Sequence, residues 1–113
     1  MAEIERKNFD QPDEIEDYGE QGNSHRVTLG IADDSTVWRS TLLPGWSWVR
    51  NIKPNVPFDR CPLHHREYVQ SGRIRYVMAD GNEVVGEASD HLLIEPGHLA
   101  EVVGDEQCVL IDW

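Results

Sequence analysis

The sequence predicts an all-β protein, and three observations support this fold class. From about residue 24 the chain is divided into short segments rich in β-branched and aromatic residues, several with alternating polar and apolar positions. Turn-forming pairs such as Pro44-Gly45, Ser71-Gly72 and Pro96-Gly97 separate them. No stretch in this part repeats apolar residues at helical spacing. Many short strands at this spacing are typical of a β-sandwich or β-barrel, and we predict a small barrel with polar groups in its lumen.

The first three expected strands are residues 26–31, 36–43 and 46–52. In the third, Trp46 and Trp48 fall on one face, where they either pack between sheets or line a pocket. Three prolines in residues 53–62 exclude a central strand there. The remaining expected strands are residues 63–70, 73–78, 83–85, 91–94, 98–103 and 108–113, with an Asp-Gly hairpin turn at residues 79–82.

The first 23 residues differ in composition from the rest of the chain. Eight of the 21 acidic residues lie in the first twenty positions, against two basic residues, and large apolar side chains are few. Such a segment has little surface to bury, so we expect residues 1–23 to form a mostly irregular, flexible arm with a hinge at Gly19 and Gly22. Residues 24–113 then form one folded domain, which suits a chain of 113 residues.

The charge excludes several classes of partner. The formal net charge of −11 argues against binding of nucleic acid or of anionic membrane surfaces, which attract basic proteins. No apolar run approaches the roughly 20 residues that cross a bilayer, and the N-terminus lacks the apolar core of a signal peptide. We therefore expect a cytoplasmic protein, in which Cys61 and Cys108 are free thiols rather than a disulfide.

One cluster carries most of the chemistry. Cys61, His64, His65 and Glu67 fall within seven positions, and His98 follows the later Pro-Gly turn. Thiolate, imidazole and carboxylate are ligands of first-row transition metals, so Cys61, His64, His65 and His98 are the candidate metal ligands. A thiolate in the set favours zinc over magnesium or calcium.

Strand alternation distinguishes the two adjacent histidines. Residues two apart share a face, so His65, Glu67 and Val69 form one set. The other set holds Arg66 and Gln70 and is expected to face solvent, and His64 belongs to it. We therefore place His65 and Glu67 inside, with Cys61 joining them if its parity continues through Pro62.

Each residue of the cluster also has a structural alternative. Cys61 could be a small buried apolar group, and His64 a surface residue. Glu67 could form an ion pair with Arg73 or Arg75 across the hairpin, and His98 could cap its turn.

The order of strands, turns and polar residues from about residue 36 to 113 resembles the cupin family, whose fold is a small jelly-roll β-barrel. Residues 68–72 resemble the end of the first cupin motif, and residues 89–97 resemble the start of the second. A subgroup of small bacterial cupins is more similar still, with Cys-x-x-His-His, Pro-Gly-His and Val-Val-Gly-Asp-Glu at matching places. The resemblance implies a cupin-like jelly-roll barrel, a homodimer and a metal site at one end of the lumen.

The chain departs from the broad family at the metal-binding positions. Counting back from Gly72, the position of the family's Glu ligand holds His65, and the two His positions hold Cys61 and Asp59. Counting forward from Gly97, the third His position holds Ala100. An iron site with the usual four ligands is therefore not expected, whereas a rearranged site remains open.

Two classes of function fit these observations. In the first, the protein is a non-redox, metal-dependent isomerase, cyclase or lyase acting on a small organic molecule, with Glu67 as the catalytic acid or base. In the second, the barrel is a non-catalytic module that binds a ligand or metal and reports its presence to a partner. Retention of metal with loss of activity on Glu67→Gln would distinguish the first class.

Overall fold

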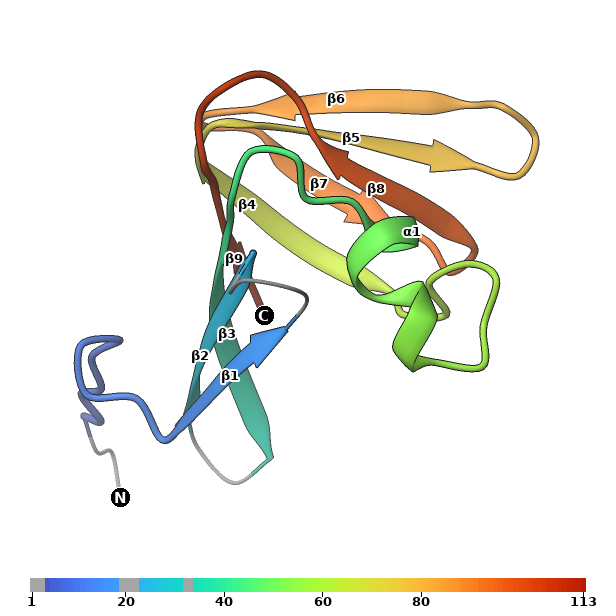
Figure 1. Ribbon diagram of the computed structural model, residues 1–113. Helices are drawn as coiled ribbons and strands as arrows, with labels where there is room; N and C mark the ends of the chain where they lie inside the picture. The colour runs from blue at the N-terminus through green and yellow to red at the C-terminus, as the bar shows by residue number, and fades with distance from the viewer. Residues whose placement is uncertain (1–3, 19–22, 32–33) are drawn as a thin grey trace.

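The computed structural model describes residues 4–18, 23–31 and 34–113, and it confirms the predicted all-β fold. The strands form a six-stranded sheet in the order β1-β2-β3-β9-β4-β7 and a three-stranded sheet in the order β6-β5-β8, with all neighbours antiparallel (Figure 1). Within the described residues, hydrogen bonds do not close the two sheets into a continuous barrel. The strands are β1 (Glu14–Tyr18), β2 (Ser24–Ile31), β3 (Ser35–Leu42), β4 (His65–Ser71), β5 (Arg73–Met78), β6 (Glu83–Glu87), β7 (His91–Ile94), β8 (His98–Val102) and β9 (Cys108–Asp112).

The hydrophobic core lies between the sheets and follows the alternation of the strands. Val69 on β4, Ile74 on β5 and Leu110 on β9 are all buried. Along β4 and β5, the residues that alternate with the buried positions are more exposed. Trp46 and Trp48 extend this core from the segment after β3. Burial of these side chains is the main stabilising term, at about 25 cal/mol for each Å² of apolar surface removed from water.

The predicted strand at residues 46–52 is wrong. Its middle forms a short helix, α1 (Trp48–Asn51), followed by a 3-10 turn, η2 (Lys53–Asn55). Ser47 is the N-cap: its Oγ accepts a hydrogen bond from Arg50 N–H at 3.1 Å, and Asn51 Oδ1 accepts one from Ser47 N–H at 3.0 Å. These two local bonds explain why helix replaced strand despite the alternating pattern. No helix in the described part of the chain has the length and apolar character needed to span a membrane.

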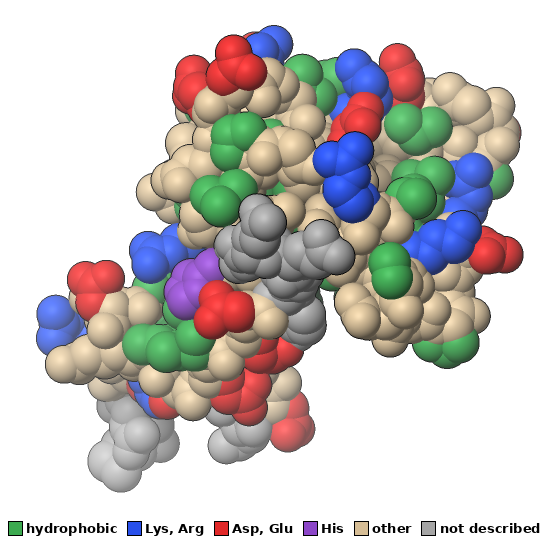
Figure 2. Space-filling view, viewed as in Figure 1, with side chains coloured by type: hydrophobic (Ala, Val, Ile, Leu, Met, Phe, Trp, Pro, Cys, Tyr) green, Lys and Arg blue, Asp and Glu red, His purple; other side chains and the backbone are tan. Residues whose placement is uncertain are grey.

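The N-terminal arm is irregular over residues 4–13 but contains a strand, which the composition did not predict. β1 pairs with β2 along its whole length and forms one edge of the larger sheet. Asp13 Oδ2 accepts a hydrogen bond from Gly30 N–H at 2.8 Å, and Arg26 donates to Glu16 at 3.0 Å. Acidic side chains gather over this part of the molecule (Figure 2). The expected hinge at Gly19 and Gly22 lies outside the described residues.

The glycine turn between β4 and β5 lies against the chain at the start of β9. Gly72 has φ +76°, and a Cβ atom there would come within 2.3 Å of the Gln107 carbonyl oxygen, just before β9. Gly45 has a similar φ of +89° with nothing within 4 Å of the Cβ position. Alanine at Gly45 would therefore carry only the cost of the left-handed backbone conformation, whereas alanine at Gly72 would also clash with the backbone before β9.

We predict that Gly72→Ala destabilises the protein much more than Gly45→Ala. The left-handed conformation alone costs a non-glycine residue about 1–2 kcal/mol, and overpacking against Gln107 adds about 1–3 kcal/mol at Gly72. Urea denaturation of both variants measures the difference. Equal losses of unfolding free energy would show that the turn next to β9 can move aside.

Candidate functional site

Two backbone hydrogen bonds join the irregular segment before β4 to the turn before β8. Cys61 N–H donates to the His98 carbonyl at 3.0 Å, and Gly97 N–H donates to the Cys61 carbonyl at 2.8 Å. β4 begins four residues later and carries His65 and Glu67 inward on one face. The fold thus brings a thiol, two imidazoles and a carboxyl group together from two distant parts of the sequence.

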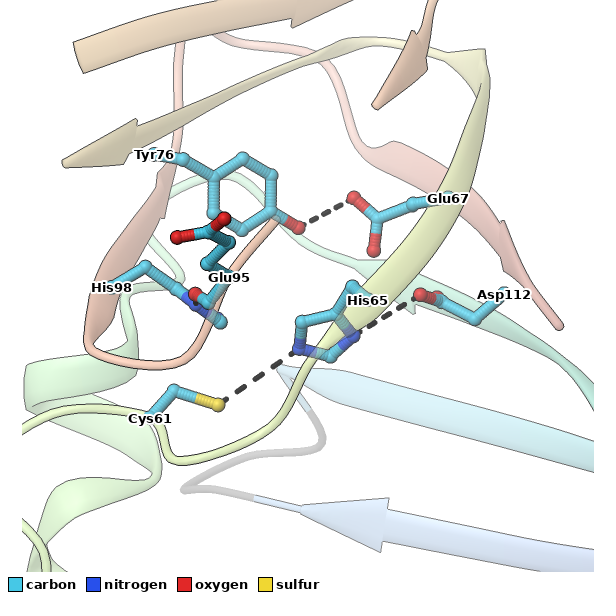
Figure 3. A network of polar contacts seen from close by, with 7 residues as sticks. All are labelled: Cys61, His65, Glu67, Tyr76, Glu95, His98 and Asp112. Carbon is cyan, nitrogen blue, oxygen red and sulfur yellow. Dashed lines mark hydrogen bonds and ion pairs between the residues drawn. The ribbon is translucent and has the colours of Figure 1, made fainter. Parts of the chain in front are cut away.

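The two imidazoles lie side by side, each oriented by a hydrogen bond at Nδ1. The ring centroids of His65 and His98 are 5.0 Å apart in an edge-on arrangement. His65 Nδ1–H donates to Asp112 Oδ1 at 3.2 Å, and His98 Nδ1–H donates to the Glu95 carbonyl at 2.7 Å (Figure 3). Both Nδ1 atoms are therefore engaged, which leaves Nε2 of each ring to bind other groups.

Cys61 completes a three-residue donor cluster, which we call the Cys-His-His cluster: Cys61, His65 and His98. Each offers one donor atom, and the three atoms lie within 4.8 Å of one another. The Cys61 sulfur is 3.9 Å from His65 Nε2. Burial alone would raise the pKa of the Cys61 thiol, but hydrogen bonds from His65 and His98 outweigh it and lower the pKa to about 6.

The hydrogen bond between Cys61 and His65 has the opposite effect on the pKa of His65, which it raises. Burial would lower the pKa of its imidazole, but the hydrogen bonds to Asp112 and Cys61 outweigh burial and raise the pKa to about 10. In the absence of metal, the buried thiol and imidazole are therefore paired as thiolate and imidazolium near pH 7.

Glu67 lies deeper, in a second polar group that shares His65. Tyr76 donates a hydrogen bond to Glu67 Oε1 at 2.5 Å, and Asp112 lies directly opposite Glu67 in the pairing of β4 with β9. Burial and the Asp112 charge raise the pKa of Glu67 to about 8, although the Tyr76 hydrogen bond opposes them. Burial, together with the Glu67 charge, also raises the pKa of Tyr76 well above its usual value.

Both polar groups line a pocket of about 410 Å³ that opens between the sheets. Much of the remaining lining is apolar and includes Trp46 and Trp48. The sequence left open whether these tryptophans pack in the core or line a pocket; they do both, from a turn and a helix rather than a strand.

The predicted site residues fall into two sets. His65, Glu67, Cys61 and His98 come together and line the pocket, and the predicted alternation along β4 is confirmed by the burial of Glu67 and Val69. His64 is exposed and lies outside both polar groups. Glu67 pairs with Tyr76 rather than with Arg73 or Arg75.

Two residues of the site, Asp112 and Tyr76, were not predicted. Asp112 occupies a buried position at the end of β9, two residues beyond buried Leu110. A lone carboxylate at a core position of an apolar strand is a signal that could have indicated it, because buried charges need partners. Tyr76 lies two residues after buried Ile74 and could have been placed in the core, but its contact with Glu67 depends on how the two sheets pack, since β4 and β5 belong to different sheets.

We predict that alkylation of Cys61 by iodoacetamide in chelator-treated protein reaches half its maximal rate near pH 6 and levels off above about pH 7. The thiolate reacts, and its pKa is lowered from the usual value of about 8.5. Mass spectrometry after timed reaction at each pH gives the rate. Burial, together with the Glu67 charge, raises the pKa of Cys108 to about 12, so this second thiol should stay unmodified.

The variant His65→Asn provides the control for this measurement, because it removes the main hydrogen bond to the Cys61 sulfur. Its midpoint should move upward toward that of an ordinary thiol. A wild-type rate that still climbs between pH 8 and 9 would contradict the thiolate–imidazolium pair.

Comparison with known proteins supports the fold class. No protein-family model matches the sequence, and no curated protein is significantly similar to it. Among solved structures, the polyketide cyclase RemF from Streptomyces resistomycificus has a TM-score of 0.65 and 17% identity, over 97% of this chain and 78% of that one. An RmlC-like cupin from Shewanella frigidimarina has a TM-score of 0.63 and 21% identity, over 97% of this chain and 88% of that one. KdgF from a Halomonas species has a TM-score of 0.56 and 14% identity, over 86% of this chain and 83% of that one. The chain therefore has the fold of the small cupins.

Proposed function

We propose that this protein binds a divalent transition metal through the Cys-His-His cluster and uses it, together with Glu67, on a small organic molecule in the pocket. The reaction class is a non-redox isomerisation, cyclisation or elimination. A polyketide cyclase among the proteins of similar fold is compatible with such a reaction. The observation that carries the proposal is the convergence of three donor atoms within 4.8 Å of one another at the wall of a 410 Å³ pocket.

The donor set suits a transition metal. One sulfur and two imidazole nitrogens are ligands that zinc accepts in tetrahedral sites with one open position, which is the usual arrangement of catalytic zinc. His65 Nδ1–H donates to Asp112 and His98 Nδ1–H to the Glu95 carbonyl, and metal-binding histidines usually make such bonds with the ring nitrogen that does not hold the metal. Because Cys61, His65 and His98 all line the pocket, an open position would be accessible to a ligand there.

In this proposal, Glu67 is the residue that moves a proton. It lines the same pocket, and its raised pKa of about 8 lies near physiological pH, where a carboxyl group both donates and accepts protons effectively. Tyr76 holds Glu67 Oε1, so the carboxyl group keeps one orientation. A bound metal would polarise a carbonyl or hydroxyl oxygen of the ligand as a Lewis acid.

We predict that His65→Ala abolishes metal binding, whereas His64→Ala leaves it unchanged. The two histidines are neighbours in sequence, but only His65 offers a donor atom to the cluster, and His64 is exposed. Elemental analysis of untagged protein, dialysed against equimolar zinc, cobalt, nickel and manganese, gives the metal content. Equal metal content in both variants would contradict the assignment. Loss of metal from His64→Ala as well would indicate a different ligand set.

We also predict that Glu67→Gln keeps its metal but loses proton transfer. Glutamine retains the shape and can still accept the Tyr76 hydrogen bond, but it cannot take up or release a proton. The readout is exchange of the hydrogens next to the carbonyl of cyclohexanone for deuterium, followed by NMR. We expect the wild-type rate to exceed the variant rate at least ~100-fold, as for removal of a general base. Wild-type protein that binds the ketone without exchange would be a binding module instead of an enzyme.

A further inference from the structure

A second hollow, of about 370 Å³, is formed by β5 and β6 of one sheet and β7 of the other. Among the described residues, Tyr76 alone lines both this hollow and the first pocket. We call the hollow the β6–β7 groove, and its lining is Tyr76, Met78, Asn82, Val84 and residues 92–95. Its volume lies in the range of small-molecule sites.

Most of the β6–β7 groove is apolar and open to solvent. Val84 and Leu93 are 50% and 70% exposed, and Leu92 and Met78 are half-buried. A ligand that covers these side chains removes apolar surface from water, which is favourable. The flexible thioether of Met78 can adapt to the shape of such a ligand. The groove therefore favours a molecule with an apolar body.

The polar residues of the groove lie at one end. Met78 pairs with His98 on β8, and its N–H donates to the Asn82 carbonyl at 2.8 Å. Glu95 comes three residues before His98, and its carbonyl accepts a hydrogen bond from His98 Nδ1–H at 2.7 Å. Asn82 and Glu95 are therefore both at the Met78 end of β5, and the apolar residues of β6 and β7 extend away from them. A matching ligand has one polar end.

The charge of this end is negative. Among the described residues that line the groove, Glu95 is the one charged group. Its side chain extends toward the Tyr76 ring, and the carboxylate has no ion pair or side-chain hydrogen bond within the described part of the chain (Figure 3). The net charge of −11 also attracts cations. The polar end of the ligand is therefore expected to be positive.

The cationic side chains of the neighbouring strands do not neutralise Glu95. Arg75 on β5 donates to a glutamate of β8 at 2.6 Å. The other arginines of β4 and β5 are exposed and lie outside the lining. The rings of His65 and His98 belong to the first pocket, where the Cys-His-His cluster brings their donor atoms together.

We propose that the β6–β7 groove binds a small primary amine, with the ammonium group at Glu95 and an apolar body against Val84 and Leu92. An ammonium group has three hydrogen-bond donors, and the Glu95 carboxylate and the Asn82 amide oxygen are both acceptors. This binding is independent of the proposed function, because the groove includes neither Glu67 nor any residue of the Cys-His-His cluster.

Four probes test the proposal: hexylammonium, hexanol, hexanoate and methylammonium. The first three share one alkyl chain and differ in charge, and the last has the charge without the chain. NMR follows binding through the isotope-labelled methyl group of Met78, one of two methionines, whose signal is identified with Met78→Leu. The protein is treated with chelator, because an amine could also bind a metal. We expect hexylammonium to bind about 3-fold more tightly than hexanol and about 10-fold more tightly than hexanoate, as for one partly exposed ion pair and its repulsive counterpart. Methylammonium should not bind.

Val84→Lys and Val85→Lys are matched variants. They add the same charge to neighbouring, exposed residues of β6, but only Val84 lines the groove, because adjacent side chains of a strand point to opposite faces. Val84→Lys should weaken hexylammonium binding at least ~10-fold by filling the groove and repelling the ligand, and Val85→Lys less than ~2-fold.

Glu95→Gln and Glu87→Gln test the ion pair. Glu95→Gln should lower the affinity for hexylammonium to that for hexanol, whereas Glu87→Gln should not, because Glu87 lies outside the groove. All four substituted side chains are exposed, and circular dichroism confirms that each variant is folded. If Val84→Lys does not fold, the ranking of the probes on wild-type protein decides.

Three results would overturn the proposal. The first is hexanoate that binds as tightly as hexylammonium. The second is an equal loss of binding in Val84→Lys and Val85→Lys, which would indicate general attraction of cations by the net charge. The third is a dimer in sedimentation that Val84→Lys dissociates and Val85→Lys does not, which would show that a second copy of this chain covers the groove.

Discussion

The pair of backbone hydrogen bonds between Cys61 and the turn at Gly97 and His98 is the constraint on which the site depends. It fixes an irregular, proline-containing segment against the start of β8, and it sets the thiol and the second imidazole on the same side. The same connection holds α1 and η2 in place as a wall of the pocket, because they immediately precede this segment. Without it, Cys61 would lie in an irregular segment with no backbone hydrogen bond to the strand that carries His98.

The deeper half of the site places two carboxyl groups in an unfavourable position. Glu67 and Asp112 face each other across β4 and β9, and both are buried. Like charges opposite one another destabilise a sheet, and buried charges need partners. Tyr76 donates to one carboxyl group and His65 to the other, so each has a compensating hydrogen bond. Such an arrangement is typical of functional sites, where a fold accepts less stable local interactions for the chemistry they allow.

Much of the fold and part of the site could be predicted from local patterns. Alternation along β4 placed His65 and Glu67 inside, because side chains two apart on a strand share a face whatever the strand pairs with. The same rule failed at residues 46–52, where Ser47 and Asn51 cap a helical turn that alternation cannot reveal. Asp112 and Tyr76 could not be assigned roles, since Asp112 meets Glu67 through the pairing of β9 with β4, and Tyr76 reaches Glu67 from the other sheet. The formation of β1 could not be predicted for the same reason, because Asp13 and Glu16 accept hydrogen bonds from Gly30 and Arg26 on β2.

The backbone hydrogen bonds between Cys61 and the turn at Gly97 and His98 have a consequence for the stability of the protein in a cell. Because His98 comes from a segment far from Cys61 and His65 in the chain, an unfolded or newly made polypeptide cannot present all three donors together, and the complete cluster exists only once both sheets have assembled. Any ion held there would therefore bind the native state more tightly than the unfolded chain and would lower the free energy of the native state by at most RT ln(1 + [L]/Kd). The supply of that ion would then govern how long each molecule resists unfolding and proteolysis, as well as what it does.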